Sequence, residues 1–264
     1  MKSIAEQDAA EMGGRGSVLS RQKQDHVKLD CLLNQLGGTP APEQGRLLLR
    51  IYRLVFPHAF AEEAVLWPVI RRALPDGEQL TLQVELEHQE INELATQLER
   101  LRPGSPEHQQ VLSRIVSLLR QDVRDEEEKL LPRLQAALSP AELRRLGFAW
   151  EAVRWIAPTR AHPIVARRPP GNLLSALPLA LLDRCRDGID VLLHSGAGPA
   201  APPLRALDRA FTGTSHAVER LPGMRSGEHP ATRLGSRSTW GWTVAAIVAV
   251  GASVMAVAQQ NRRS

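Results

Sequence analysis

The chain has 264 residues, of which 43% are hydrophobic and 4% aromatic, so it is long enough for one large domain or two modest ones. Residues 1–150 carry 19 basic and 22 acidic side chains, whereas residues 151–264 carry 14 basic and 7 acidic ones. The arginines of the second half are scattered without interleaved aromatic residues, which argues against a nucleic-acid partner. Two cysteines, Cys31 and Cys185, are too few for a disulfide scaffold and are typical of a reducing compartment.

Strong helix formers dominate the first 150 residues, which predicts an all-α domain. Residues 1–17 are polar and contain no apolar signal segment, so we expect a flexible leader there. Four long helices are predicted at about 18–36, 43–74, 78–101 and 106–138, followed by a short fifth helix that ends near residue 149. Because the connections are short, we expect an up-down-up-down four-helix bundle over residues 18–150.

Several helix boundaries have specific signals. Ser105 precedes Pro106, which suits an N-cap followed by the first helical position. The segment Ser139-Pro-Ala-Glu142 has the pattern of a capping box. Pro57 and Pro68 lie inside the second predicted helix, where each removes a backbone donor, so kinks or a short break are expected.

The second half has a different texture. Residues 151–238 are rich in Pro and Arg and are interpreted as a linker, with one amphipathic helix from Leu173 to His194 interrupted at Pro178, and a largely disordered stretch over 195–238. The histidines of this region have no partners at metal-binding spacing and are interpreted as linker residues: His162, His194, His216 and His229.

A run of nineteen uncharged residues follows, from Trp240 to Ala258, with arginines on both sides. This length is enough to span a bilayer, and the two tryptophans would suit an interfacial belt. The sequence therefore predicts a transmembrane helix over 239–259. We expect a single-pass C-terminal membrane anchor with the bundle in the cytoplasm.

The first half contains an internal repeat. The segment from His58 through Glu62-Glu63 to Pro68 has its counterpart 64 residues later, in Asp122, Glu126-Glu127 and Pro132. An acid followed by a histidine also recurs, as Asp25-His26 and Glu87-His88. The first two helices therefore resemble the next two as hairpins.

The repeated positions predict a metal site. Residues i and i+4 share a face of a helix, so His58 and Glu62 can direct an imidazole and a carboxylate to one point. An antiparallel bundle would bring the repeated positions to similar heights along its axis. Nitrogen and carboxylate ligands suit iron, manganese or zinc, and carboxylates able to bridge favour two ions over one. The candidate ligands are His26, His58, Glu62, His88, Asp122 and Glu126.

These segments resemble the hemerythrin-like HHE cation-binding family, and the similarity spans about residues 18–138. The resemblance implies an up-down four-helix bundle around a non-haem di-iron centre, which binds oxygen in some members. Carried over by position, the iron ligands would be His26, His58, Glu62, His88 and Glu126. Glu62 and Glu126 would be the carboxylate bridges.

Asp122 departs from this pattern, because the family and the internal repeat both predict histidine there. Either Asp122 ligates iron, or one iron keeps an open position, or the site holds a single metal. Asp30 and Asn92, one turn after His26 and His88, could fill the gap or support the imidazoles.

The leading functional expectation is a membrane-tethered, hemerythrin-like non-haem iron protein that binds or senses oxygen, peroxide, nitric oxide or iron. Whether it is an enzyme is left open. A di-iron oxidase or peroxidase is one alternative, since an open iron position would suit a substrate. A helical adaptor without metal is the other, because loss of one histidine is what early decay of a site would look like.

Overall fold

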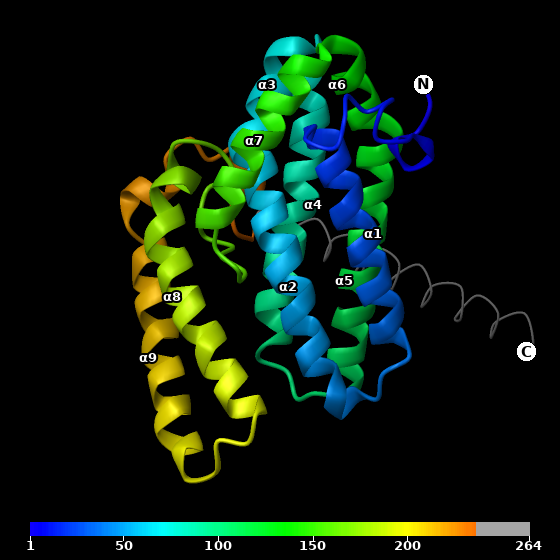
Figure 1. Ribbon diagram of the computed structural model, residues 1–264. Helices are drawn as coiled ribbons and strands as arrows, with labels where there is room; N and C mark the ends of the chain where they lie inside the picture. Colours follow the sequence, from blue (N-terminus) through cyan, green and yellow to red (C-terminus); the bar gives the residue numbers. More distant parts are fainter. Residues whose placement is uncertain (236–264) are drawn as a thin grey trace, which may run out of the picture.

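The computed structural model describes residues 1–235, and the regular structure within them is helical, as expected. Four helices run side by side with alternating direction (Figure 1). They are α1 (Val18–Gly37), α2 (Gln44–Ala61), α4 (Gly77–Leu98) and α5 (Pro106–Asp125). Short 3₁₀ turns occur outside them: η1 (Ile4–Glu6), η2 (Ala41–Glu43), η5 (Gly198–Ala200), η6 (Pro222–Arg225) and η7 (Pro230–Thr232).

The second and fourth helices of the bundle each contain a π-helical turn at the repeated glutamates. Helix α2 continues through Pro57 into η3 (Glu62–Leu66), which leads into α3 (Trp67–Ala73). In the same way α5 leads into η4 (Glu126–Leu130) and then α6 (Leu131–Ala137). The expected break is therefore a π turn that begins at the first repeated glutamate and ends two residues before each repeated proline. Such turns are frequent at functional sites.

The cap signals are confirmed where they were specific. The Ser105 side chain accepts a hydrogen bond from the His108 backbone, with Pro106 at the first helical position of α5. Ser139 and Glu142 form the expected capping box at the start of α7 (Pro140–Ile156). Helix α7 crosses one end of the bundle against α1 and α2 (Figure 1).

The interior consists of two apolar clusters at different heights. One contains the second half of α1 and the first half of α2, with members such as Leu33 and Ile51. The other contains the opposite ends of these helices together with α7, with members such as Leu19, Trp67 and Trp150. In each bundle helix the chain passes from one cluster to the other through a short polar stretch, and this layer contains the candidate ligands.

The flanking segments differ from the expected leader and linker. Ile4 and Met12 are buried in the cluster beside α7, so residues 1–17 pack against the bundle. Beyond α7 the chain forms a helical hairpin of α8 (Gly171–His194) and α9 (Ala201–Glu219) alongside the bundle (Figure 1). Helix α8 runs through Pro178 without interruption. The high Pro and Arg content suggested a linker, but it is compatible with two packed helices. An ion pair between Arg186 and Asp208 joins them.

The predicted membrane anchor is corrected. Among residues 1–235 no helix is both long and apolar enough to cross a membrane. Helix α8 has 24 residues but carries five charged side chains between Asp183 and Asp190, which make it too polar for a bilayer core. The segment 239–259 lies outside the described residues. A transmembrane helix and the single-pass membrane localisation derived from it are therefore not supported.

Candidate metal centre

The structure brings all six predicted ligands into one buried layer between the two apolar clusters. None of them is more than 9% exposed. Helix α1 contributes His26, α2 and its π turn contribute His58 and Glu62, α4 contributes His88, and α5 and its π turn contribute Asp122 and Glu126. The internal repeat therefore corresponds to two hairpins that face each other across this layer.

The Nε2 atoms of the three imidazoles face carboxylates in the middle of the layer. His58 Nε2 lies 3.1 Å from Glu62 Oε1, and His26 Nε2 lies 3.2 Å from Glu126 Oε2. His88 Nε2 lies 3.7 Å from Glu62 Oε2 and 3.6 Å from Asp122 Oδ2. Nitrogen and oxygen donors therefore converge from all four helices of the bundle.

The opposite ring nitrogens are held by a second set of carboxylates. His26 Nδ1 lies 2.9 Å from Glu127, and His88 Nδ1 lies 3.0 Å from Glu63, so each imidazole is held by the second glutamate of the other hairpin. His58 Nδ1 lies 3.1 Å from Asp25. A carboxylate that accepts a hydrogen bond from Nδ1–H leaves Nε2 free as a ligand atom, as is usual for metal-binding histidines.

The ionisation of these groups is strongly coupled to burial and to one another. Burial lowers the pKa of His58, but Glu62 and Asp25 outweigh it and raise this pKa to about 9. Burial would raise the pKa of Glu62, but the neighbouring imidazoles, His58 foremost, hold it at about 2. The pKa of Glu126 is raised well above its ordinary value, first by burial and then by the charges of Glu62 and Asp122.

Several atoms of this layer are buried without a hydrogen-bond partner among the described residues. They are His26 Nε2, His88 Nε2, Glu62 Oε2, Asp122 Oδ1 and Glu126 Oε1. Buried polar atoms are rarely left unsatisfied, and a bound ion is one of the ordinary reasons for such a cluster. Two groups could each hold a cation, one of His26, His58 and Glu126 and the other of Glu62, His88 and Glu126. The residues present therefore fit one or two metal ions, with Glu126 common to both groups.

The Asp122 side chain reaches the layer but makes its charge more negative than a histidine would. Its counterpart in the first hairpin is His58, which is neutralised by Asp25. Asp122 instead lies near Glu87, the counterpart of Asp25, and two carboxylates thus occupy the place of an imidazole and a carboxylate. Burial and the Asp122 charge raise the pKa of Glu87 to about 7.

The two residues suggested as substitutes do not contact the imidazole rings. Asp30 is exposed and accepts a hydrogen bond from Asn34. Asn92 donates to the His88 backbone carbonyl and accepts from the His162 backbone. The expectation that Asp30 or Asn92 supports the rings was therefore wrong. The sequence did offer a signal for the true partners, because Glu63 and Glu127 are repeated together with the ligands.

Residues beyond the bundle reach the same imidazoles from outside. Trp150 of α7 lies edge-on to His58, with ring centroids 5.3 Å apart. Arg154 stacks over Trp150 and lies 3.0 Å from Asp25, the carboxylate that holds His58. Arg167, in the loop before α8, approaches within 3.9 Å of Glu63, which holds His88. Sequence reasoning missed this outer layer.

Part of the sequence is similar to known proteins. Residues 17–134 match the family model described as hemerythrin HHE cation binding domain. An uncharacterized hemerythrin-like protein of Schizosaccharomyces pombe is 24% identical over 131 residues, which cover 49% of this chain and 64% of the relative. A DNA nickase of Nostoc sp. is 26% identical over 133 residues, which cover 50% of this chain and 37% of the relative.

The aligned region covers less than two thirds of either relative's length, and both alignments involve about half of this chain. No solved structure matches the chain significantly. The family match covers the bundle that contains all six candidate ligands, and it ends before α7. The resemblance to the hemerythrin HHE cation-binding domain is thus found as a family-model match over residues 17–134, the part of the chain that contains the candidate ligands.

Proposed function

We propose that the bundle binds non-haem iron as two ions through His26, His58, Glu62, His88, Asp122 and Glu126. The observation that carries this proposal is the buried layer itself, in which three imidazole Nε2 atoms face three carboxylates while each Nδ1 is held by a further carboxylate. The match of residues 17–134 to the HHE cation-binding family model supports iron over other cations. Glu126, common to both cation-binding groups, is the best placed bridge.

The protein residues have distinct tasks in this proposal. Asp25, Glu63 and Glu127 fix the three rings so that Nε2 points inward. The apolar clusters on both sides keep water away from the layer, which strengthens the attraction between the donors and a cation. Bound iron would supply redox chemistry and coordination positions for a small molecule. We propose that dioxygen, nitric oxide or peroxide is that molecule, and that the protein binds or senses it.

Iron content of the full chain tests this proposal, beside an Asp122→His variant expressed under the same conditions. Elemental analysis should find two irons per chain, and air oxidation should produce near-ultraviolet charge-transfer absorption. One iron in the native chain and two in the variant would instead make this a half-occupied relative. Metal-free protein whose stability does not change on adding ferrous iron would contradict iron binding and leave the adaptor hypothesis.

A di-iron peroxidase or oxidase is a second candidate, favoured by the position of Asp122. The carboxylate is shorter than an imidazole, and it lines a small cavity next to His58. Peroxide turnover by the iron-loaded chain above that of free iron would support this candidate. The nicking activity named for the Nostoc relative is not extended to this chain, since the alignment covers 37% of that protein.

A further inference from the structure

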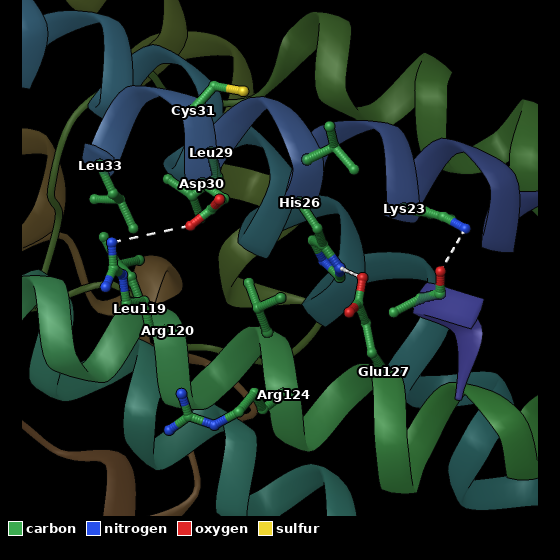
Figure 2. Close-up of a pocket in the computed structure, with 13 residues that line it drawn as sticks. Lys23, His26, Leu29, Asp30, Cys31, Leu33, Leu119, Arg120, Arg124 and Glu127 are labelled. Atoms are coloured by element: carbon green, nitrogen blue, oxygen red, sulfur yellow. Dashed lines mark hydrogen bonds and ion pairs between the residues drawn. The ribbon is translucent and has the colours of Figure 1, made fainter. Parts of the chain in front are cut away.

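A pocket opens on the bundle surface between α1 and α5 (Figure 2). Its volume is about 400 Å³, within the range of small-molecule sites. Polar pairs extend from α1 on either side of it, Asp30 with Arg120 of α5 and His26 with Glu127 of η4, as Figure 2 shows. Between these bridges the pocket wall is apolar and includes Leu29, Leu33, Leu119 and Val123.

A second, much smaller cavity lies deeper in the bundle. Its volume is about 20 Å³, enough for about one water-sized molecule. The side chains of His58 and Asp122 line it, so it touches the candidate metal centre at the position where the chain departs from its family. Asp25 also lines it, and the α2 part of its wall beside His58 is apolar, with Leu54, Val55 and Ala59.

The two spaces share part of their walls. His26, Leu29, Leu119 and Val123 line both the surface pocket and the inner cavity. His26 is held in place by Glu127, whereas the other three are aliphatic side chains without polar partners to fix them. Rotamer changes of exposed or half-buried side chains occur in picoseconds to nanoseconds, so Val123, which is half-buried, can open and close such a partition readily.

We propose that the gap between α1 and α5 is the entry path for a small uncharged molecule to the centre, with Leu29, Leu119 and Val123 as its gate. This inference rests on the proposed function, since it names the class of molecule that the iron centre admits. An apolar gate disfavours ions, because a charge that leaves water without a partner there pays a large desolvation cost. The inner volume restricts the molecule to about the size of dioxygen or nitric oxide.

Xenon tests the path without any metal. In the metal-free full chain, xenon pressure should shift the methyl resonances of Leu54 and Val55, which line the inner cavity. Val123→Phe should weaken or slow these shifts by filling the gate. Val116→Phe is the matched control, because Val116 is also half-buried on α5 but lines neither space. Absence of xenon-dependent shifts at Leu54 and Val55 in the native chain would overturn the proposal.

Nitric oxide association tests the path in the iron-loaded chain by stopped-flow absorption. Val123→Phe should slow association about tenfold at unchanged iron content, Val123→Ala should accelerate it, and Val116→Phe should leave it unchanged. Equal rates in all four proteins would overturn the path. If the chain takes up no iron, the proposed function fails, and the xenon experiment still decides whether the gate leads to the inner cavity.

Discussion

Glu62 and Glu126 occupy equivalent positions of the internal repeat, yet their surroundings differ because of one residue. One turn before Glu62 stands His58, whose Nε2 lies 3.1 Å away. One turn before Glu126 stands Asp122, whose like charge adds to the effects of burial and of the Glu62 charge in raising the pKa of Glu126. Because Asp122 stands where the repeat predicts a histidine, the Glu126 carboxylate has a like charge one turn before it instead of an imidazole. A bound iron cation would therefore stabilise the ionised form of Glu126 more than that of Glu62.

This asymmetry predicts opposite effects of two matched variants on the metal-free protein. Glu126→Gln should raise Tm by a few degrees near neutral pH, because a carboxyl whose folded-state pKa is raised costs stability once the pH exceeds its unfolded value of about 4.3. Glu62→Gln should lower Tm, because a folded-state pKa of about 2 means that its carboxylate stabilises the fold at neutral pH. Both variants should lose iron. Calorimetry checks the signs, and a shift in the same direction for both would contradict this account.

At the scale of elements, α7 and the loop before α8 act on the centre from outside the region that matches the family. Arg154 lies 3.0 Å from Asp25 and approaches Trp150 from the face of its ring. Since Asp25 holds His58, we expect Arg154 to position the His58 ring through that carboxylate. The matched domain alone would lack this support.

Arg154→Ala should therefore weaken ferrous iron binding by about tenfold, the lower end of what loss of an outer partner of a metal ligand costs. Competition with a coloured chelator measures the affinity on the full chain. Arg154→Lys should recover part of it because the charge beside Asp25 is restored. Arg145→Ala, an exposed change on the same helix, should have no effect. Equal affinity for the Ala variants at both positions would show that Arg154 is not a positioning residue.

Helix α7 packs closely against the backbone that leads into α1, and Gly147 lies at the point of contact. A Cβ at Gly147 would lie 2.2 Å from the Gly16 carbonyl oxygen, whereas a Cβ at Gly188 in α8 would meet nothing within 4 Å. Gly147→Ala should therefore cost about 1–3 kcal/mol of unfolding free energy by displacing α7. Gly188→Ala should instead raise the unfolding free energy by about 0.5–1 kcal/mol, because alanine has the higher helix propensity. Urea unfolding measures both, and a stabilising Gly147→Ala would contradict the close packing.

The elements that the sequence predicted are those with local signals. Each of these signals spans only a few residues of the sequence. They are the caps at Ser105 and Ser139, the Gly and Pro connections and the repeated glutamates, and together they define the helix ends and the layer of candidate ligands. The contacts of Arg154 and Arg167 join segments far apart in the chain, so no local pattern indicates them. Helix α8 was predicted from its apolar pattern, although without its continuity through Pro178. Helix α9 and the packing of the hairpin were missed for a similar reason, because charges that pair between distant segments look like surface charges in the sequence.

At the scale of the whole molecule, one buried ionic cluster joins the α8–α9 hairpin to the bundle. The His162 ring lies between Asp183 on α8, at 3.0 Å, and Glu219 on α9, at 2.7 Å. The His162 backbone N–H donates to Asn92 on α4, one turn after His88. A residue interpreted as part of a linker thus connects three helices, and we expect its charge to contribute to the attachment of the hairpin beside the Arg53–Asp187 ion pair.

That charge predicts how stability depends on pH. Burial lowers the pKa of His162, but Asp183 and Glu219 outweigh it and raise this pKa to about 9. Because the folded-state value exceeds the unfolded value of about 6.5, the contribution is fully present below about pH 6.5 and is lost as the pH rises through about 9. Its upper bound is ~3 kcal/mol, since each pKa step of one corresponds to about 1.4 kcal/mol.

His162→Gln should therefore be less stable than the native chain near pH 6, by up to ~3 kcal/mol. The difference should narrow as the pH rises from about 6.5 to about 9 and should be smallest above about pH 9. Urea unfolding of both proteins across this range measures the difference at each pH. Comparing the two proteins cancels the titration of His58, whose pKa is also raised to about 9. His194→Gln, an exposed change at the end of α8, is the control and should give no difference. A gap between His162→Gln and the native chain that stays constant with pH would mean that the ring holds the hairpin by packing and not by its charge.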